Sequence, residues 1–152
     1  MELTAHGEYV ELSFERVSLH DEGDVQRWAK ELTAALGHYA RPVDMLLDLR
    51  DVHVTSRVGP ACARVIDQIL RRHAAAVSYF GADQATGEVL GPTLADHDGG
   101  PGWPERNSAL RCLMQRRGLR LAEGVRPRPV TPHLPVGSVG RRTWKGSGTT
   151  AV

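Results

Sequence analysis

The sequence has few of the features that identify membrane, secreted or disulfide-bonded proteins. Its 152 residues include two cysteines, and no run reaches the roughly 18 apolar residues that a membrane span needs. The opening stretch MELTAHGEYVELSFER has charged residues where a secretion signal needs an apolar segment. We therefore expect no membrane span, no secretion signal and a cytoplasmic location.

Residues that bind metals or catalyse reactions are scattered along the chain rather than grouped. Cys62 and Cys112 each lie in a helix-like apolar pattern and not in a CxxC pair, which predicts free buried thiols. The seven histidines form no HxH or HxxxH pair, and the loop with Asp96, His97 and Asp98 has too few ligands for a metal. The motifs GxGxxG after a strand, GxxxxGK(S/T) and GxSxG are absent. We expect no metal, no cofactor and no enzymatic activity.

The charged residues divide the chain into two parts. Residues 119–152 contain six basic residues against Glu123 alone, a formal charge of +5, which leaves −4 for residues 1–118. The second part also has four prolines and no periodic apolar face, so it cannot bury enough surface to offset its ordering entropy. We predict one domain over 1–118 and a flexible, basic, Pro/Gly-rich tail over 119–152. The tail interleaves only Trp144 with its charges, so nonspecific attraction to nucleic acid is the most that follows, and nucleic acid is not an expected partner.

Polar and apolar residues alternate near the N-terminus and then repeat at helical spacing. The alternation from Val10 to Phe14 predicts a strand that pairs with residues 1–5 in a hairpin. Residues 20–36 have apolar residues at helical spacing, with acidic residues near the positive end of the helix dipole and Gly37 as a stop signal.

The following residues repeat a pattern of strand and helix. The nearly continuous apolar run PVDMLLDL predicts a central strand buried on both faces. The segment SRVGPACARVIDQILRRHA predicts a helix with Ser56 as its N-cap and Pro60 in an early turn. AAVSYFG predicts another strand, TGEVLGPT a weaker one, and ERNSALRCLMQRRG a last helix. The order ββαβαβ(β)α indicates an α/β fold with a mixed, mainly parallel sheet and an N-terminal hairpin.

Two aspartates, Asp44 and Asp48, share one face of the predicted central strand. The carboxyl ends of strands in α/β proteins often carry functional carboxylates, but a catalytic pair also needs a second group and a pocket. We interpret Asp48 as a structural acceptor for loop amides.

The order of elements, with MLLDLRDVHVTSRVG at its centre, resembles the STAS domain, the SpoIIAA-like fold of anti-sigma-factor antagonists. The resemblance covers roughly residues 1–118. In that family a strand ending in an Asp-Leu-like pair leads to an Asp-Ser-Ser/Thr-Gly turn, where a kinase partner phosphorylates a serine. With Asp48, Leu49 and Gly59 aligned, that serine falls on Arg57, which has no hydroxyl to phosphorylate.

The resemblance implies a regulatory module that binds another protein, such as a kinase or an anti-sigma-like component of a signalling complex. The expected partner-binding residues are Thr55, Ser56, Arg57, Val58 and Gly59. Arg57 either offers a fixed cationic contact to an acidic surface or simply points into water. Ser56 and Thr55 are candidate phosphorylation sites, or else Ser56 is only a helix cap and Thr55 a strand-end residue.

Two other functions stay open. Some STAS-like proteins have apolar pockets, so a small-ligand or lipid-binding domain is the alternative, which an apolar cavity would favour. An enzyme is the third hypothesis. The oligomeric state does not follow from the sequence.

Overall fold

The computed structural model describes residues 1–97, 100–122 and 141–143, and its main sheet has five strands in the order β6-β4-β2-β1-β7. The strands are β1 (Glu2–Ala5), β2 (Val10–Ser13), β4 (Val43–Asp48), β6 (Ala74–Phe80) and β7 (Arg141–Thr143). The strands β2, β4 and β6 run parallel, whereas β1 pairs antiparallel with both β2 and β7. The predicted α/β fold with a mainly parallel sheet and an N-terminal hairpin is confirmed.

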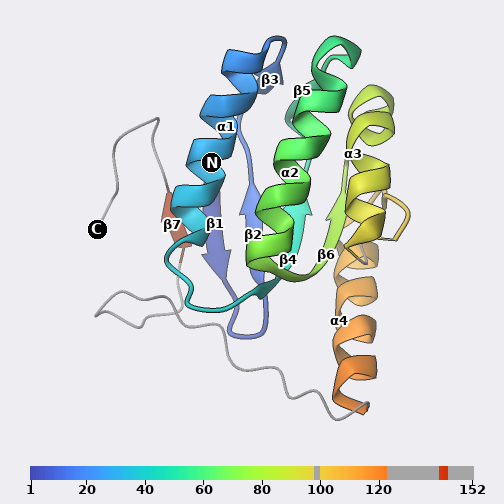
Figure 1. Cartoon of the computed structure of the whole chain (residues 1–152). Coiled ribbons are helices and arrows are strands. Elements are labelled where there is room, and N and C mark those ends of the chain that lie inside the picture. The colour runs from blue at the N-terminus through green and yellow to red at the C-terminus, as the bar shows by residue number, and fades with distance from the viewer. Residues whose placement is uncertain (98–99, 123–140, 144–152) are drawn as a thin grey trace.

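Among the described residues, four α-helices cover the two faces of this sheet. The helices α1 (Glu22–Leu36) and α2 (Gly59–His73) lie side by side across one face, with α3 (Gln84–Asp96) next to α2 (Figure 1). The helix α4 (Arg106–Ala122) packs on the opposite face. Each face therefore has its own hydrophobic core.

The strand β4 contributes to both cores. All six of its residues are buried, and it lies between β2 and β6 in parallel register with each. Met45 and Leu47 pack against α1, α2 and α3, whereas Leu46 packs against α4. This arrangement confirms the prediction of a central strand buried on both faces.

The helix α1 begins and ends where the sequence predicts. Asp21 is its N-cap, and Asp24 N–H donates to Asp21 Oδ1 (2.8 Å) while Asp21 N–H donates to Asp24 Oδ2 (3.3 Å). This reciprocal pair is a capping box, which satisfies two backbone donors at the helix start. Gly37 follows the last helical residue, and its N–H donates to the Thr33 carbonyl (2.9 Å).

The segment TGEVLGPT is not a weak strand, as the sequence suggested, but part of α3. Asp83 caps this helix by accepting the Thr86 N–H (2.7 Å). Leu90 and Leu94 lie four residues apart and are buried in the core beside α2. Their burial outweighs the low helix propensity of the glycines and of Pro92 in this segment.

Two short elements between β4 and α2 correct the sequence prediction. The strand β5 (Val52–Val54) pairs in parallel with β3 (Val17–Leu19) as a separate two-stranded sheet, which the sequence did not indicate. The 3₁₀ helix η1 (Ser56–Val58) follows β5, so Ser56 is its first residue and not the N-cap of α2. The cap position of α2 is Val58, which has no side-chain acceptor, while Pro60 lies in the first turn as predicted.

The predicted tail, residues 119–152, falls mostly outside the described residues. Its first four residues, 119–122, complete α4, so this helix continues past position 118. Residues 141–143 form β7, which pairs with β1 in the register Glu2↔Thr143, Leu3↔Arg142 and Thr4↔Arg141.

Candidate functional site

The predicted binding face, residues 55–59, is a short turn fixed at both ends, which we call the η1 turn. At its start, the Thr55 N–H and hydroxyl both donate to the Leu19 carbonyl (3.1 and 3.2 Å). At its end, Val58 is buried in the core, and Gly59 lies so close to Val89 that a Cβ would be 3.2 Å from Cγ2. Contacts to β3, the core and α3 therefore hold the turn in place.

Only part of the η1 turn faces solvent. Ser56 and Arg57 are exposed and Thr55 is half-buried, whereas Val58 and Gly59 are buried and offer little surface to a partner. Within the residues that the structure describes, the Arg57 side chain has no hydrogen bond or ion pair. The Thr55 hydroxyl is already bonded to a carbonyl. Of the two candidate phosphorylation sites, Ser56 therefore has the accessible hydroxyl.

A polar network ties β5, the strand that precedes the η1 turn, to α3. Thr86 is fully buried, and its hydroxyl oxygen accepts the Val54 N–H (3.1 Å) while donating to the Val52 carbonyl (3.1 Å). His53 Nδ1 lies 2.6 Å from Asp83 Oδ2. The hydrogen bond from the Thr86 N–H, and next the bond with His53, hold the pKa of Asp83 below its ordinary value.

The sequence contained a signal for this network that our prediction did not use. Asp83 follows a strand and precedes Thr86 by three residues, which is the spacing of an N-cap and the backbone N–H that it accepts.

A second polar group, Asp48 and Arg50, lies where β4 ends. The Asp48 carboxylate accepts the Arg50 backbone N–H (3.1 Å) and its guanidinium through Nε (2.9 Å) and Nη2 (2.7 Å). These side-chain hydrogen bonds raise the pKa of Arg50 above its ordinary value. The same guanidinium lies over the Phe80 ring, with Cζ 5.4 Å from the ring centroid. The prediction that Asp48 accepts a loop amide is confirmed.

Two residues in the loops after the parallel strands, Arg16 and Gly81, have a left-handed backbone conformation. Gly81 has a φ of 77°, and a Cβ on it would lie 2.2 Å from Arg50 Cγ. Arg16 has a φ of 51°, and its N–H donates to Asp51 Oδ2 (2.7 Å). Arg16 and Arg50 are both exposed, and each follows the carboxyl end of a parallel strand.

Two groups of ion pairs fix α4 to the sheet. Arg106, at the start of the helix, binds Glu11 of β2 through two nitrogens. Near the other end, Arg120 Nη2 lies 2.5 Å from Asp44 Oδ1, and Arg117 Nη1 lies 3.3 Å from Asp44 Oδ2. Asp44 is thus a buried carboxylate with two guanidinium partners.

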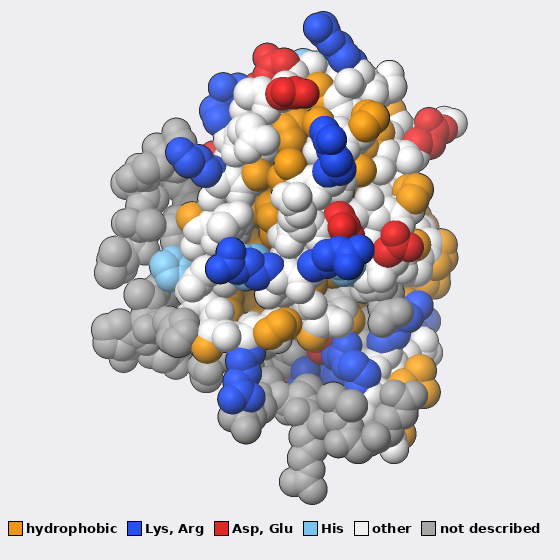
Figure 2. Space-filling view, in the orientation of Figure 1, with side chains coloured by type: hydrophobic (Ala, Val, Ile, Leu, Met, Phe, Trp, Pro, Cys, Tyr) orange, Lys and Arg blue, Asp and Glu red, His pale blue; other side chains and the backbone are white. Residues whose placement is uncertain are grey.

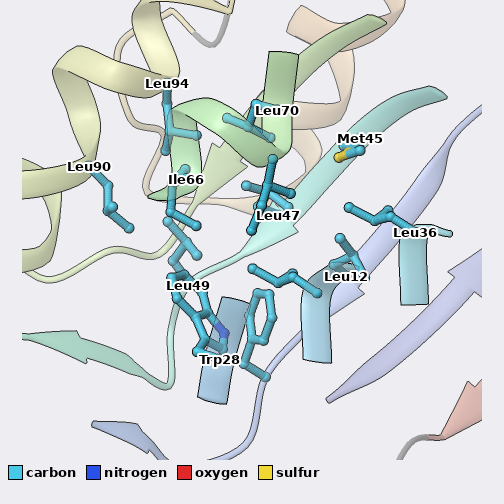
Figure 3. Close-up of a pocket in the computed structure, with 13 residues that line it drawn as sticks. Leu12, Trp28, Leu36, Met45, Leu47, Leu49, Ile66, Leu70, Leu90 and Leu94 are labelled. Carbon is cyan, nitrogen blue, oxygen red and sulfur yellow. The ribbon is translucent and has the colours of Figure 1, made fainter. Parts of the chain in front are cut away.

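An apolar cavity of about 20 Å³ lies in the core between the sheet and α1, α2 and α3 (Figure 3). Its lining is entirely apolar and includes Trp28 of α1, Leu47 of β4 and Leu90 of α3. A cavity of this size holds about one water-sized sphere, whereas pockets for small molecules measure about 300–1,000 Å³. The Trp28 indole N–H is buried and has no hydrogen-bond partner among the described residues.

The other candidate groups form no reactive or metal-binding cluster in the described part of the chain. Cys62 and Cys112 are free thiols, as predicted, although Cys112 is only partly buried. Burial raises the pKa of the Cys62 thiol to about 11, so it is protonated at neutral pH. His97 Nε2 lies 3.0 Å from Asp67 Oδ1, and Asp98 falls outside the described residues.

Residues 1–97, 100–122 and 141–143 contain neither a metal-binding cluster nor a membrane-spanning helix. They contain no group of three or more His, Cys, Asp or Glu side chains placed to bind a metal ion. They also contain no helix whose length and hydropathy would allow it to cross a membrane.

Comparison with known proteins assigns no family to this chain. The sequence matches no family model, and it resembles no curated protein at a significant level. The proposed function therefore rests on the η1 turn and on the contacts that hold it.

Proposed function

We propose that the chain is a non-enzymatic, STAS-like regulatory module that binds an acidic surface of another protein through the exposed part of the η1 turn. The observation that carries this proposal is Arg57, which is exposed and unpaired among the described residues although the turn on both sides of it is fixed. A guanidinium offers five donors in a planar arrangement that fits a carboxylate. A fixed backbone also lowers the entropy lost on binding.

The topology supports the STAS-like part of the proposal. An antiparallel hairpin leads into the parallel strands β2, β4 and β6, and the η1 turn precedes α2, where STAS domains carry their phosphoacceptor turn. Arg57 occupies the acceptor position with a permanent positive charge. Binding through this turn would therefore be constitutive and would not depend on a phosphoserine at that position.

The surface charge supports recognition by individual contacts. Basic and acidic side chains are interspersed over the face that α1 and α2 form (Figure 2). Such a mixture gives no broad field of one sign to attract a charged partner from a distance. A partner on this side of the molecule would be selected by local pairs, of which Arg57 offers one.

The test uses a photo-crosslinking amino acid at the exposed position 56 of the full chain, expressed in its host. Arg57→Glu should reduce the major crosslinked product at least tenfold, because a repulsive charge replaces the attractive one. Arg57→Lys should keep most of the product. The matched control is Arg64→Glu, an exposed charge reversal on α2 that should leave the product unchanged.

Identification of the crosslinked protein completes the test. Reversal of an acidic residue on that protein should restore binding to the Arg57→Glu variant, as expected for a direct charge pair. Equal crosslinking by the wild type and the Arg57→Glu variant would refute the proposal.

A small apolar ligand or lipid is the second candidate, because only apolar side chains line the cavity and the Trp28 N–H beside it has no partner. The cavity would have to expand more than tenfold to reach the size of an ordinary ligand pocket. Native mass spectrometry of the protein from its host would then show a copurifying lipid-sized mass. A Leu47→Trp variant, which fills the cavity, should lose that mass. If protein purified from its host has only the mass of the chain without a ligand, this candidate is ruled out.

A further inference from the structure

The two edges of the main sheet are closed in different ways. At the β6 edge, Val77 N–H donates to the His97 carbonyl (3.2 Å), Trp103 N–H donates to the Tyr79 carbonyl (3.2 Å), and Gly81 N–H donates to the Trp103 carbonyl (2.9 Å). Trp103 is also packed against the core beside α4. The β6 edge is therefore closed by the connection between α3 and α4.

The β1 edge is paired, among the described residues, with β7 alone. The strand β7 has three residues, and it is separated from α4 by residues 123–140, which include four prolines. Three residues form only a few hydrogen bonds, each of about 1 kcal/mol net. Ordering each residue costs about 1–2 kcal/mol, so only a small net free energy favours the paired state and β7 can leave the edge.

The strand β1 itself does not depend on β7. Leu3 and Ala5 are buried, and all four residues of β1 pair with β2. If β7 leaves, β1 keeps its place in the sheet and presents a preformed row of unpaired backbone groups. Such an edge accepts an extended segment from another chain by adding a strand.

The β7 segment indicates what kind of strand this edge accepts. Its sequence is Arg-Arg-Thr, and it belongs to the part of the chain with a formal charge of +5, while residues 1–118 carry −4. Glu2 of β1 pairs in register with Thr143 of β7. The edge strand therefore has an acidic residue in register with the end of the basic segment.

We propose that the β1 edge is a docking site for an extended basic segment of another protein, and that residues 141–143 occupy it within the chain as a competing internal ligand. The main chain of the added strand supplies the hydrogen bonds, and adjacent basic residues supply the preference. This site is separate from the η1 turn, so the two proposals can fail independently. Binding of the external segment requires displacement of β7, so β7 regulates access to the β1 edge.

The first experiment removes the pairing ability of β7 in the full chain with the double substitution Arg141→Pro/Arg142→Pro. Successive residues of an antiparallel strand point their N–H groups to opposite sides, so one of the two prolines necessarily removes a donor to β1. By NMR, the β1 amides that face β7 should exchange with solvent at least tenfold faster than in the wild type. The β1 amides that face β2 should keep their rates and serve as an internal control.

The matched variant Arg141→Ala/Arg142→Ala removes the same charges but keeps both N–H groups. It should keep most of the protection of the β1 amides, because main-chain pairing survives. Equal loss of protection in the alanine and proline variants would mean that charge alone holds the segment and would overturn the proposal. Rapid exchange, in the wild type, of the β1 amides that face β7 would also overturn the proposal.

The second experiment adds a synthetic peptide with the sequence of residues 138–146, SVGRRTWKG, to the proline variant. At millimolar concentration the peptide should restore protection of the outer β1 amides, and it should bind the wild type at least tenfold more weakly because β7 competes. A peptide that restores no protection would overturn the proposal. Wild-type protein that forms a dimer through exchanged β7 strands would show that a second copy is the occupant, which would also overturn it.

Discussion

The Arg106 guanidinium binds the Glu11 carboxylate with two parallel hydrogen bonds, Nε to Oε1 at 2.8 Å and Nη2 to Oε2 at 2.7 Å. The two residues are 95 positions apart, and their pair joins the start of α4 to β2. Arg106 Nη2 also donates to the Tyr9 hydroxyl (3.3 Å), and His6 Nε2 lies 3.2 Å from Glu11 Oε2. Glu11 is therefore the acceptor at the centre of a network that fixes α4 over the sheet.

The first prediction concerns the pH dependence of this pair. The hydrogen bonds from Arg106 are the largest cause that lowers the pKa of Glu11 from its ordinary value of 4.5. A carboxylate with a lowered pKa in the folded state contributes stability above its unfolded pKa, and this contribution disappears as pH falls through the folded pKa. Glu11→Gln should therefore reduce the free energy of unfolding at pH 7, and this reduction should shrink as the pH falls below about 4.5.

We expect a reduction of roughly 0.5–1.5 kcal/mol at pH 7, at the low end for a charge-assisted pair because solvent screens the partly exposed Arg106. Urea unfolding of both proteins between pH 3 and pH 7 measures the difference. The exposed Glu105→Gln variant is the control and should show no such pH dependence. A constant difference between the wild type and Glu11→Gln across this range would contradict the prediction.

The second prediction concerns Gly81. An alanine there would need a φ of 77° and would place its Cβ 2.2 Å from Arg50 Cγ. Gly81→Ala should therefore lower the free energy of unfolding by about 2–3 kcal/mol, of which the left-handed backbone accounts for about 1–2 kcal/mol. In the Arg50→Ala background the same change should cost about 1 kcal/mol less, because the Cγ contact is gone.

Chemical denaturation of the four proteins of this cycle measures the coupling between positions 50 and 81. Gly87→Ala is a matched control, because Gly87 lies inside α3 and a Cβ there would meet no atom within 4 Å. That substitution should stabilise the protein by about 0.4–1 kcal/mol. Additive effects of Arg50→Ala and Gly81→Ala would show that the side chain of Arg50 moves away without cost.

The elements that the sequence predicted share long, clear patterns of apolar residues. The run from Val43 to Leu49 predicted β4, and helical spacing with acidic residues at its start predicted α1. In both cases the local pattern and the tertiary packing agree, since the buried residues are those that the pattern places on the apolar side.

The remaining elements depend on contacts between distant residues. The strands β3 and β5 have three residues each, too few to show a period, and they form because they pair with each other. The helix α3 contains Gly87, Gly91 and Pro92, and packing of its leucines decides its conformation. In the candidate site, the resemblance to the STAS turn singled out Arg57, but the bonds that fix the η1 turn join residues more than 30 positions apart, such as Thr55 and Leu19.

The third prediction concerns Ser56. Because Ser56 lies inside η1 and does not cap α2, Ser56→Ala should change the free energy of unfolding by less than about 0.5 kcal/mol. Asp21→Ala removes a true N-cap and should cost about 1 kcal/mol. Thermal unfolding of the two variants compares them directly. A loss at Ser56 as large as that at Asp21 would show that the Ser56 hydroxyl supports α2 after all.

The last prediction concerns Thr86, whose hydroxyl joins α3 to β5 and so supports the start of the η1 turn. Thr86→Val keeps the shape of the side chain but leaves the buried Val54 N–H and Val52 carbonyl without their partner. Leaving such groups unsatisfied costs about 1–3 kcal/mol, and the free energy of unfolding should fall by that amount. The Val54 amide should also exchange faster with solvent, which NMR measures at a single residue.

Thr86→Ser is the matched variant, because it keeps the hydroxyl and loses only a methyl group. Its cost should be about 1 kcal/mol from the small cavity, and the Val54 amide should remain protected. If the hydroxyl fixes β5, photo-crosslinking from position 56 should also become less specific in Thr86→Val and not in Thr86→Ser, because β5 leads directly into the η1 turn. Equal protection of Val54 in both variants would show that strand pairing with β3 holds β5 without help from α3, and the support of the turn would then lie in the Thr55–Leu19 contact alone.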